Sequence, residues 1–87
     1  MEIDCDPAKD AWNIAKRALP FRLAAVLLAN LVGEFEDVRG VYGERRMVAF
    51  GMVDGRLLCC VYTLRGDTVG VISLRKASGK QQTRWLS

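Results

Sequence analysis

The chain of 87 residues has a net charge of +3, from 13 Lys and Arg against 10 Asp and Glu, and it contains three Cys and no His. This length predicts one domain over residues 1–87 with a thin core. Without His or a Cys-x-x-Cys motif, neither a Cys/His nucleophile pair nor a mixed zinc site can form, so we expect no metal and no cofactor. No stretch approaches the roughly 20 apolar residues of a membrane span, and the first residues are acidic, so we expect a cytoplasmic protein without membrane contact.

The charge is divided unevenly along the chain. Residues 1–38 hold four basic and seven acidic side chains, giving −3, whereas residues 39–87 hold nine basic and three acidic ones, giving +6. A locally positive potential of this kind favours a polyanion as the partner over a small apolar ligand.

The N-terminal half predicts a strand followed by two helices. Residues 2–5 alternate and suit a short strand, and Asp6-Pro7 is typical of a helix start, with Asp6 as N-cap. The helix over 7–17 is expected to bury a stripe of Ala8, Ala11, Trp12 and Ala15.

A second, largely apolar helix is predicted over 21–31. Gly33 is expected to end this helix. Residues 33–43 carry Glu34, Glu36 and Asp37 with two glycines, which is typical of an exposed loop, and we expect this loop to be the most mobile segment.

The C-terminal half predicts an antiparallel meander and a tail helix. Runs over 46–53, 56–64 and 68–75 are rich in β-branched, aliphatic and aromatic residues. Asp54-Gly55 favours a type I′ hairpin turn and Arg65-Gly66-Asp67 a short hairpin loop. The tail over 78–87 is expected to form a helix capped by Ser78 and anchored by Trp85. The whole pattern predicts an α+β fold: a short strand and two helices packed on a three- to four-stranded antiparallel sheet, with a short C-terminal helix.

These turns also predict a register, in which Val53 faces Arg56 and Leu64 faces Thr68. One face of the meander then presents Arg46, Val48, Phe50, Leu57, Cys59, Val61, Thr63, Val71, Ser73 and Arg75. The opposite face presents Met47, Ala49, Gly51, Leu58, Cys60, Tyr62, Gly70, Ile72 and Leu74. Both faces are largely apolar, and we expect the helices to cover the first. The adjacent Cys59 and Cys60 point to opposite faces and cannot simply pair, so we expect reduced thiols.

Short motifs along the chain resemble those of one known family. The matching residues are Asp6-Pro7-Ala8-Lys9, Asn13, Lys16, Phe21, Glu44-Arg45-Arg46, Gly51, Asp54-Gly55-Arg56-Leu57-Leu58, Val61-Tyr62-Thr63, Arg65-Gly66-Asp67 and Ile72-Ser73-Leu74-Arg75-Lys76-Ala77. In this order and spacing the chain resembles the BrnT family, the toxin half of the bacterial BrnT–BrnA type II toxin–antitoxin systems. The resemblance implies a RelE-like fold, ribonuclease activity that arrests translation, and a ribbon-helix-helix antitoxin of the BrnA kind, through which alone operator DNA would be contacted.

Metal-independent RNA cleavage defines the catalytic groups to look for. In-line attack by the 2′-hydroxyl needs a proton acceptor, positive charge near the phosphorane oxygens and a proton donor at the departing 5′ oxygen. We predict Arg46 and Arg75 as phosphate clamps and Tyr62 as a proton donor or base-stacking ring. Turnover should be slow, because Arg and Lys have reference pKa values of about 10 or higher. The register places Arg46 and Arg75 on one face but toward opposite ends of the sheet.

Further RNA contacts are predicted at Lys16, Arg17, Arg65, Ser73 and Lys76. Blander roles stay open for several of these side chains. Tyr62 suits a packing role equally well, Arg65 in a hairpin loop is often merely solvated, and Ser73 can form local hydrogen bonds only.

One departure from the family pattern bears on activity. Where many BrnT sequences have Lys-His-Gly, this chain has Lys16-Arg17-Ala18. Arg cannot exchange a proton near neutral pH as His does. Two hypotheses therefore compete: a metal-independent ribonuclease toxin, and a catalytically inactive module that keeps the antitoxin interface and acts as a corepressor. An exposed apolar second helix would also favour a homodimer.

Overall fold

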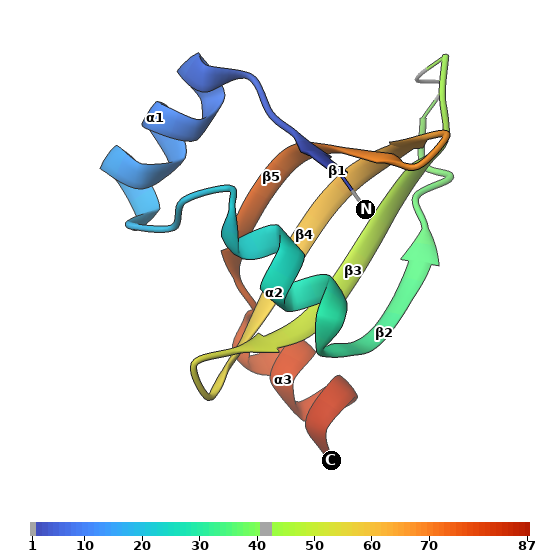
Figure 1. Ribbon diagram of the computed structural model, residues 1–87. Helices are drawn as coiled ribbons and strands as arrows, with labels where there is room; N and C mark the ends of the chain where they lie inside the picture. The colour runs from blue at the N-terminus through green and yellow to red at the C-terminus, as the bar shows by residue number, and fades with distance from the viewer. Residues whose placement is uncertain (1, 41–42) are drawn as a thin grey trace.

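A computed structural model describes residues 2–40 and 43–87, and within these residues five strands form one mixed sheet. The elements follow the chain in the order β1 (Glu2–Asp4), α1 (Pro7–Arg17), α2 (Leu23–Ala29), β2 (Leu31–Glu36), β3 (Arg46–Val53), β4 (Arg56–Arg65), β5 (Thr68–Lys76) and α3 (Gly79–Leu86). In space the strand order is β1-β5-β4-β3-β2. The α+β prediction is confirmed, although the expected sheet had only three to four strands (Figure 1).

The β3–β4–β5 meander forms as its turn residues predict. Asp54 and Gly55 both have positive φ, 51° and 75°, the backbone that a type I′ turn requires. Val53 pairs with Arg56 as expected, but the second turn is tighter than predicted, so Arg65 rather than Leu64 pairs with Thr68. The register shifts again between Val61 and Tyr62, which pair with Ser73 and Val71.

The segment predicted as an exposed loop is partly an edge strand. Residues 31–36 form β2, which pairs antiparallel with β3, and the preceding helix is shortened to seven residues. Gly33 therefore lies within a strand and does not end a helix; there its missing side chain leaves room for the ring of Trp85. Tolerance of Glu34 and Glu36 is a property of edge strands, where side chains remain hydrated. The predicted mobility of residues 41–42 lies outside the described residues.

The N-terminal strand makes the sheet mixed. β1 is confirmed as a short strand, and it pairs parallel with β5 at the edge opposite β2. The long connection through α1, α2, β2, β3 and β4 permits this parallel pairing, which a hairpin could not form.

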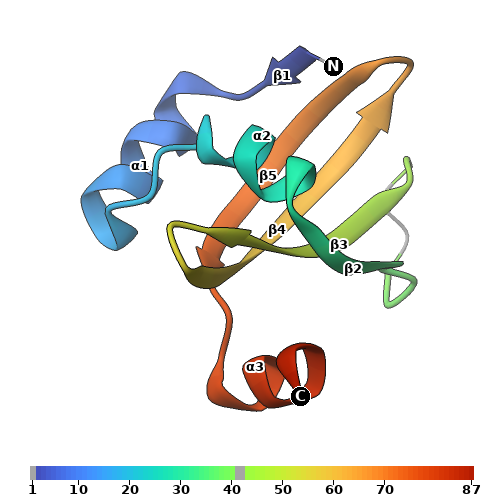
Figure 2. The same cartoon turned by 60° about the horizontal axis from the view of Figure 1, so that its bottom comes forward.

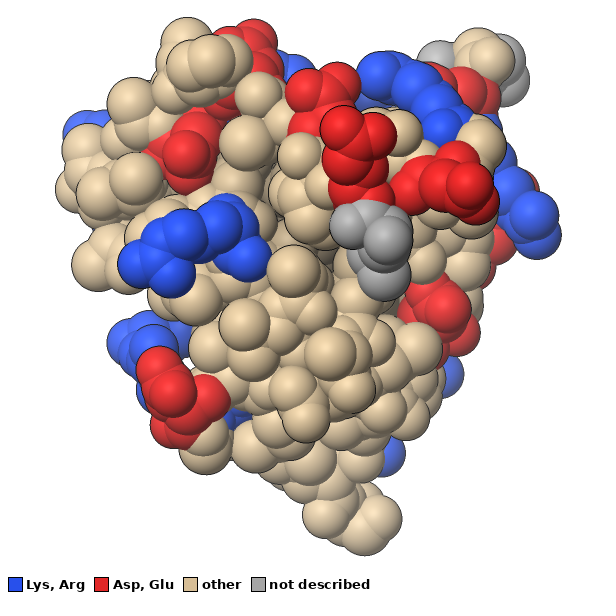
Figure 3. Space-filling view, in the orientation of Figure 1, with Lys and Arg blue, Asp and Glu red and all other residues tan. Residues whose placement is uncertain are grey.

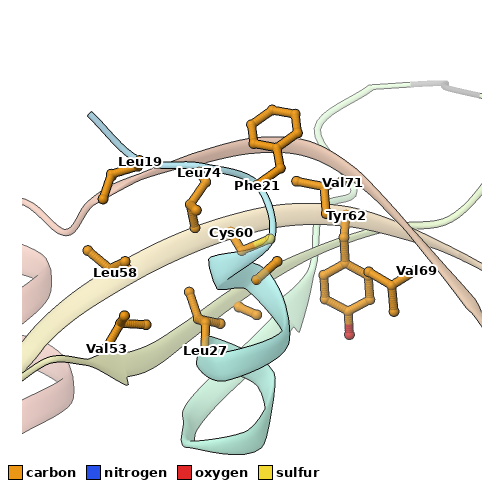
Figure 4. Close-up of a cluster of buried hydrophobic side chains, with 12 residues drawn as sticks. Leu19, Phe21, Leu27, Val53, Leu58, Cys60, Tyr62, Val69, Val71 and Leu74 are labelled. Carbon is orange, nitrogen blue, oxygen red and sulfur yellow. The ribbon is translucent and has the colours of Figure 1, made fainter. Parts of the chain in front are cut away.

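The two N-terminal helices cover the sheet face opposite to the one we predicted. The main core cluster contains Leu19, Phe21, Ala24 and Leu27 from the helical region and Ala49, Val53, Leu58, Cys60, Tyr62, Val69, Val71 and Leu74 from the sheet (Figure 4). The register shift places Val71 on this face, beside Tyr62 and Val69. The short α2 crosses β3 so closely that a Cβ on Gly51 would collide with the Leu27 carbonyl.

The other face of the sheet is covered by α3. Figure 2 shows this helix on the side of the sheet away from α2. Its Trp85 ring stacks on Phe50, with centroids 5.2 Å apart, in a second cluster that includes Val48, Leu57 and Cys59. The predicted Ser78 N-cap is confirmed, and the tail helix therefore completes a second, smaller core.

The expected apolar stripe of α1 is not buried. Ala8, Ala11, Trp12 and Ala15 are all exposed, and the helix instead packs through Asn13. The Asn13 amide donates hydrogen bonds to the carbonyl oxygens of Leu19 and Leu74, at 2.8 and 2.9 Å. Polar contacts rather than apolar burial therefore hold α1 against β5.

Free thiols occur at all three cysteine positions. Cys59 and Cys60 are buried on opposite faces of β4, as predicted, while Cys5 is only partly buried. Burial raises the pKa of Cys60 to about 12 and raises the pKa values of Cys5 and Cys59 as well. In the described parts of the chain, no helix is long and apolar enough to cross a membrane.

Candidate functional site

The C-terminal end of α1 and the C-terminal end of β5 lie side by side and enclose a basic cleft (Figures 1 and 2). The basic cleft is lined by Lys16 and Arg17 from α1 and by Arg75 and Lys76 from β5, with a volume of about 510 Å³. Its remaining described lining residues, Ala15, Ala18 and Leu19, carry no charge. Four side chains that were predicted from distant parts of the sequence are thus brought to one place.

The backbone at the end of α1 explains how its two cations reach the cleft. Ala18 adopts a left-handed conformation with φ of 56°, and its N–H donates to the Ile14 carbonyl, which closes the last helical turn. The chain then reverses toward Leu19, so Lys16 and Arg17 occupy the last turn, where helix carbonyls favour positive charge. A left-handed residue with a Cβ is strained, by roughly 1–2 kcal/mol.

Arg17 is held in place by contacts with its own helix and with β5. Its Nη1 donates to Asn13 Oδ1 and to the Leu74 carbonyl, both at 3.3 Å. Its guanidinium also lies over the Trp12 ring, 5.2 Å from the centroid. Arg17 is therefore a positioned cation, and it has no capacity to accept a proton near neutral pH.

Arg75 is held by the first turn of α3. Its Nη1 donates to Gln81 Oε1 at 3.0 Å and to the Lys76 carbonyl at 3.1 Å. Gln81 also accepts from the Ser78 N–H at 2.9 Å, as part of a capping box. The sequence analysis did not single out Gln81 as a functional residue, although the Ser78-x-x-Gln81 spacing is a signal that could have located it.

Ser73 lies beside the basic cleft. It lines a small adjoining hollow together with Lys9, Trp12 and Asn13, and Arg17 lines both the hollow and the cleft. Five of the eight predicted site residues, Lys16, Arg17, Ser73, Arg75 and Lys76, are therefore neighbours around Arg17.

Arg46 and Arg65 line a different cleft, of about 440 Å³, which also contains Asp4, Asp6 and Glu44. Arg65 forms a two-pronged ion pair with Glu44, at 2.7 and 2.9 Å. The hydrogen bond from Arg65 lowers the pKa of the Glu44 carboxyl. This second cleft carries both signs of charge and suits a polyanion less well than the basic cleft.

The two predicted phosphate clamps do not meet. Arg46 pairs with Thr63 of β4, whereas Arg75 pairs with Cys59 of the same strand. Four residues of strand separate these positions by about 13 Å. Arg46 and Arg75 therefore cannot hold a single phosphate together.

Tyr62 lies on the sheet face covered by α2 and is 7% exposed. Its hydroxyl donates a short hydrogen bond to Glu34 Oε1, at 2.6 Å. Burial, together with this carboxylate, raises the pKa of the Tyr62 phenol above its ordinary value. Arg75 points to the opposite face and contacts α3, so Tyr62 and the basic cleft are separated by the sheet.

The described residues contain no cluster of three or more His, Cys, Asp or Glu side chains that could hold a metal ion. Hydrogen-bond donors and positive charge are what the basic cleft offers, and phosphate oxygens are the groups that such a set of side chains binds best.

A small α+β protein with a cation-lined cleft is suited to bind a polyanion. A family model described as the ribonuclease toxin BrnT of type II toxin–antitoxin systems matches residues 5–81, and the chain belongs to this family. The match includes every residue of the basic cleft, and membership implies an RNA target and an antitoxin partner. No curated protein matches the chain.

Proposed function

We propose that this protein is a metal-independent endoribonuclease toxin whose RNA substrate lies in the basic cleft. The observation that carries the proposal is the convergence of Lys16, Arg17, Arg75 and Lys76 on one cleft whose described lining residues include no carboxylate. Cations in such a cleft have no internal counter-charge at hand, so an RNA phosphate can supply it.

The cleft residues support a division of labour at the scissile phosphate. Arg75, oriented by Gln81, and Arg17, oriented by Asn13, stabilise the negative charge that builds up on the phosphorane oxygens. As the 2′ oxygen bonds to phosphorus, the bond to the 5′ oxygen breaks, and the ammonium of Lys76 or Lys16 donates the proton that this leaving oxygen needs. Water accepts the proton of the 2′-hydroxyl.

Slow turnover follows from the same set of side chains. Proton transfer is most efficient when the pKa of the catalytic group lies near the working pH, and no described lining residue of the cleft meets this condition. Ser73 is close enough to contact the ribose or an adjacent phosphate. Arg46, Tyr62 and Arg65 stay predicted site residues, but this proposal does not use them.

We infer the remaining properties from family membership and from the exposed apolar residues. Cleavage of cytoplasmic RNA arrests translation, and a ribbon-helix-helix antitoxin of the BrnA kind neutralises the toxin and alone contacts operator DNA. The exposed Val26, Leu31 and Val32 of α2 and β2 support an antitoxin interface on this side, and a toxin homodimer would form within the complex. Figure 3 shows a broad uncharged surface over α2, with acidic side chains gathered over β1 and β2.

The test compares RNA cleavage and growth arrest in matched variants. Purified protein should cleave RNA in EDTA, and Arg75→Ala combined with Lys76→Ala should lower the rate about 100-fold or more. Arg45→Ala is the control, because Arg45 is an exposed arginine that pairs with Glu36 outside the cleft. If Arg46→Ala or Arg65→Ala abolishes cleavage while the double variant remains active, the site is misassigned.

A second candidate function is supported by Arg17, which stands where the family has His. A catalytically inactive module would keep its fold and its antitoxin but leave RNA intact. Such a protein should copurify with a small ribbon-helix-helix protein and show no cleavage above the double variant. Cleavage that requires Arg75 and Lys76 would exclude this alternative.

A further inference from the structure

Trp12 is an exposed aromatic ring beside the basic cleft. The residue is 52% exposed, and its helix packs on β5 through Asn13 rather than through the indole. The Arg17 guanidinium lies over the ring, and Arg17 is also part of the cleft lining. An indole in this position is available to a ligand that already occupies the cleft.

We propose that Trp12 is a nucleobase-binding subsite, on which a base next to the scissile phosphate stacks while Arg17 holds that phosphate. The inference rests on the proposed function, because it assumes that RNA lies in the basic cleft. Single-stranded nucleic acid is commonly bound by this combination of a cationic track and an aromatic ring, since every base has a flat face.

The chemistry around the ring fits a nucleotide. The hollow beside Trp12 is lined by Lys9 and Arg17, and Ser73 adds a hydroxyl that can donate to or accept from a base or ribose. Asp and Glu do not occur among its described lining residues. Lys9 and Arg17 thus extend the positive potential of the cleft to the ring.

Other exposed apolar residues lack this setting. The hollow near Leu31 and Leu64 is lined by Glu34 and Asp67, which would repel a phosphate backbone. Phe35 is a half-exposed aromatic residue on β2, and it stacks with Phe50 in place of a cation. Phe35 therefore provides a matched control for Trp12.

The experiment measures binding of a mixed-sequence 2′-O-methyl RNA decamer, which cannot be cleaved because its attacking hydroxyls are methylated. Trp12→Ala should weaken binding by about 5- to 100-fold, the range expected for the loss of one stacked base. Trp12→Phe should keep most of the affinity, and Phe35→Ala should bind like the wild type. In a Trp85→Phe background, Trp12 is the sole tryptophan, and its fluorescence should be quenched by the decamer.

Decamers with single abasic sites give the decisive comparison. One abasic position should weaken binding to the wild type but not to Trp12→Ala, because the variant has already lost the stacked base. Equal weakening of both proteins at every position would overturn the subsite. A Trp12→Ala protein that binds RNA normally but loses its antitoxin would also overturn it, and would assign this face to protein binding.

The same measurements separate the subsite from the proposed function. If Arg75→Ala with Lys76→Ala loses the decamer while Trp12→Ala does not, the RNA cleft stands and the subsite is wrong. If the wild type does not bind the decamer at all, both inferences are overturned.

Discussion

Ala18 shows how one residue connects backbone strain to the site. It is left-handed at the end of α1, where many family members have glycine, and its conformation turns the chain so that Lys16 and Arg17 face β5. Glycine adopts this backbone without steric penalty. The alanine therefore stores strain beside the basic cleft.

Ala18→Gly should stabilise the fold by about 1 kcal/mol, since relief of the left-handed strain exceeds the added flexibility of the unfolded chain. Urea unfolding monitored by circular dichroism measures the change. Ala15→Gly is the control, because Ala15 lies in regular helix and its replacement should destabilise by about 1 kcal/mol. Equal losses in both variants would show that Ala18 is not strained.

Tyr62 predicts a pH dependence at alkaline pH. Its pKa is raised in the folded protein, so the unfolded chain releases the phenol proton first as the pH rises. Stability from this group is complete below about pH 10, the ordinary tyrosine value, and is lost above it. Tyr62→Phe should therefore lose less stability than the wild type between pH 9 and pH 11, as measured by urea unfolding. Parallel curves for the two proteins would contradict this account.

The elements β2 and α3 depend on each other. Gly33 of β2 accommodates the Trp85 ring, and the same ring stacks on Phe50 of β3. The edge strand and the tail helix therefore close the second core together. The polar content of 33–43 concealed β2, because edge strands tolerate residues that are otherwise typical of loops.

Trp85→Ala should destabilise the protein by about 2–3 kcal/mol, somewhat less than for a fully buried tryptophan, because Trp85 is only partly buried. It should also loosen α3, whose Gln81 orients Arg75, and so reduce RNA cleavage. Thermal unfolding and the cleavage assay measure the two effects. Leu86→Ala, at a half-exposed position of the same helix, should change both only slightly. A stable Trp85→Ala protein would show that α3 is not anchored by its ring.

At the scale of the whole molecule, the fold concentrates positive charge that the chain carries in two distant segments. Lys16 and Arg17 belong to the acidic half of the sequence, and Arg75 and Lys76 belong to the basic half. Contact between α1 and β5 joins them. At the other end of the sheet, Glu44 pairs with Arg65, so the net charge of +3 understates the potential at the cleft.

Four phosphate contacts predict a salt dependence for RNA binding. The logarithm of the binding constant for single-stranded RNA should fall with the logarithm of salt concentration with a slope of about −3, and Arg75→Ala with Lys76→Ala should halve that slope. Titration of a labelled decamer between low and physiological salt gives both values. The Arg45→Ala control should keep the wild-type slope, and an unchanged slope in the double variant would place the phosphates elsewhere.

By itself the sequence determined the elements whose signals are local. Caps at Asp6 and Ser78, the positive-φ turn at Asp54-Gly55 and the apolar runs of β3, β4 and β5 depend on neighbours in the chain, and all were confirmed. The family motifs and the uneven charge likewise pointed to a polyanion.

Only the tertiary structure decided which sheet face carries each helix, that residues 31–36 form a strand, and which cations share a cleft. Both sheet faces are apolar, so periodicity could not choose between them, and the shift at Val61/Tyr62 moved Val71 to the α2 side. The separation of Arg46 from Arg75 and the approach of Lys16 to Lys76 depend on contacts between distant segments. Local backbone preference does not encode such contacts, because they form only when the helices and the sheet pack.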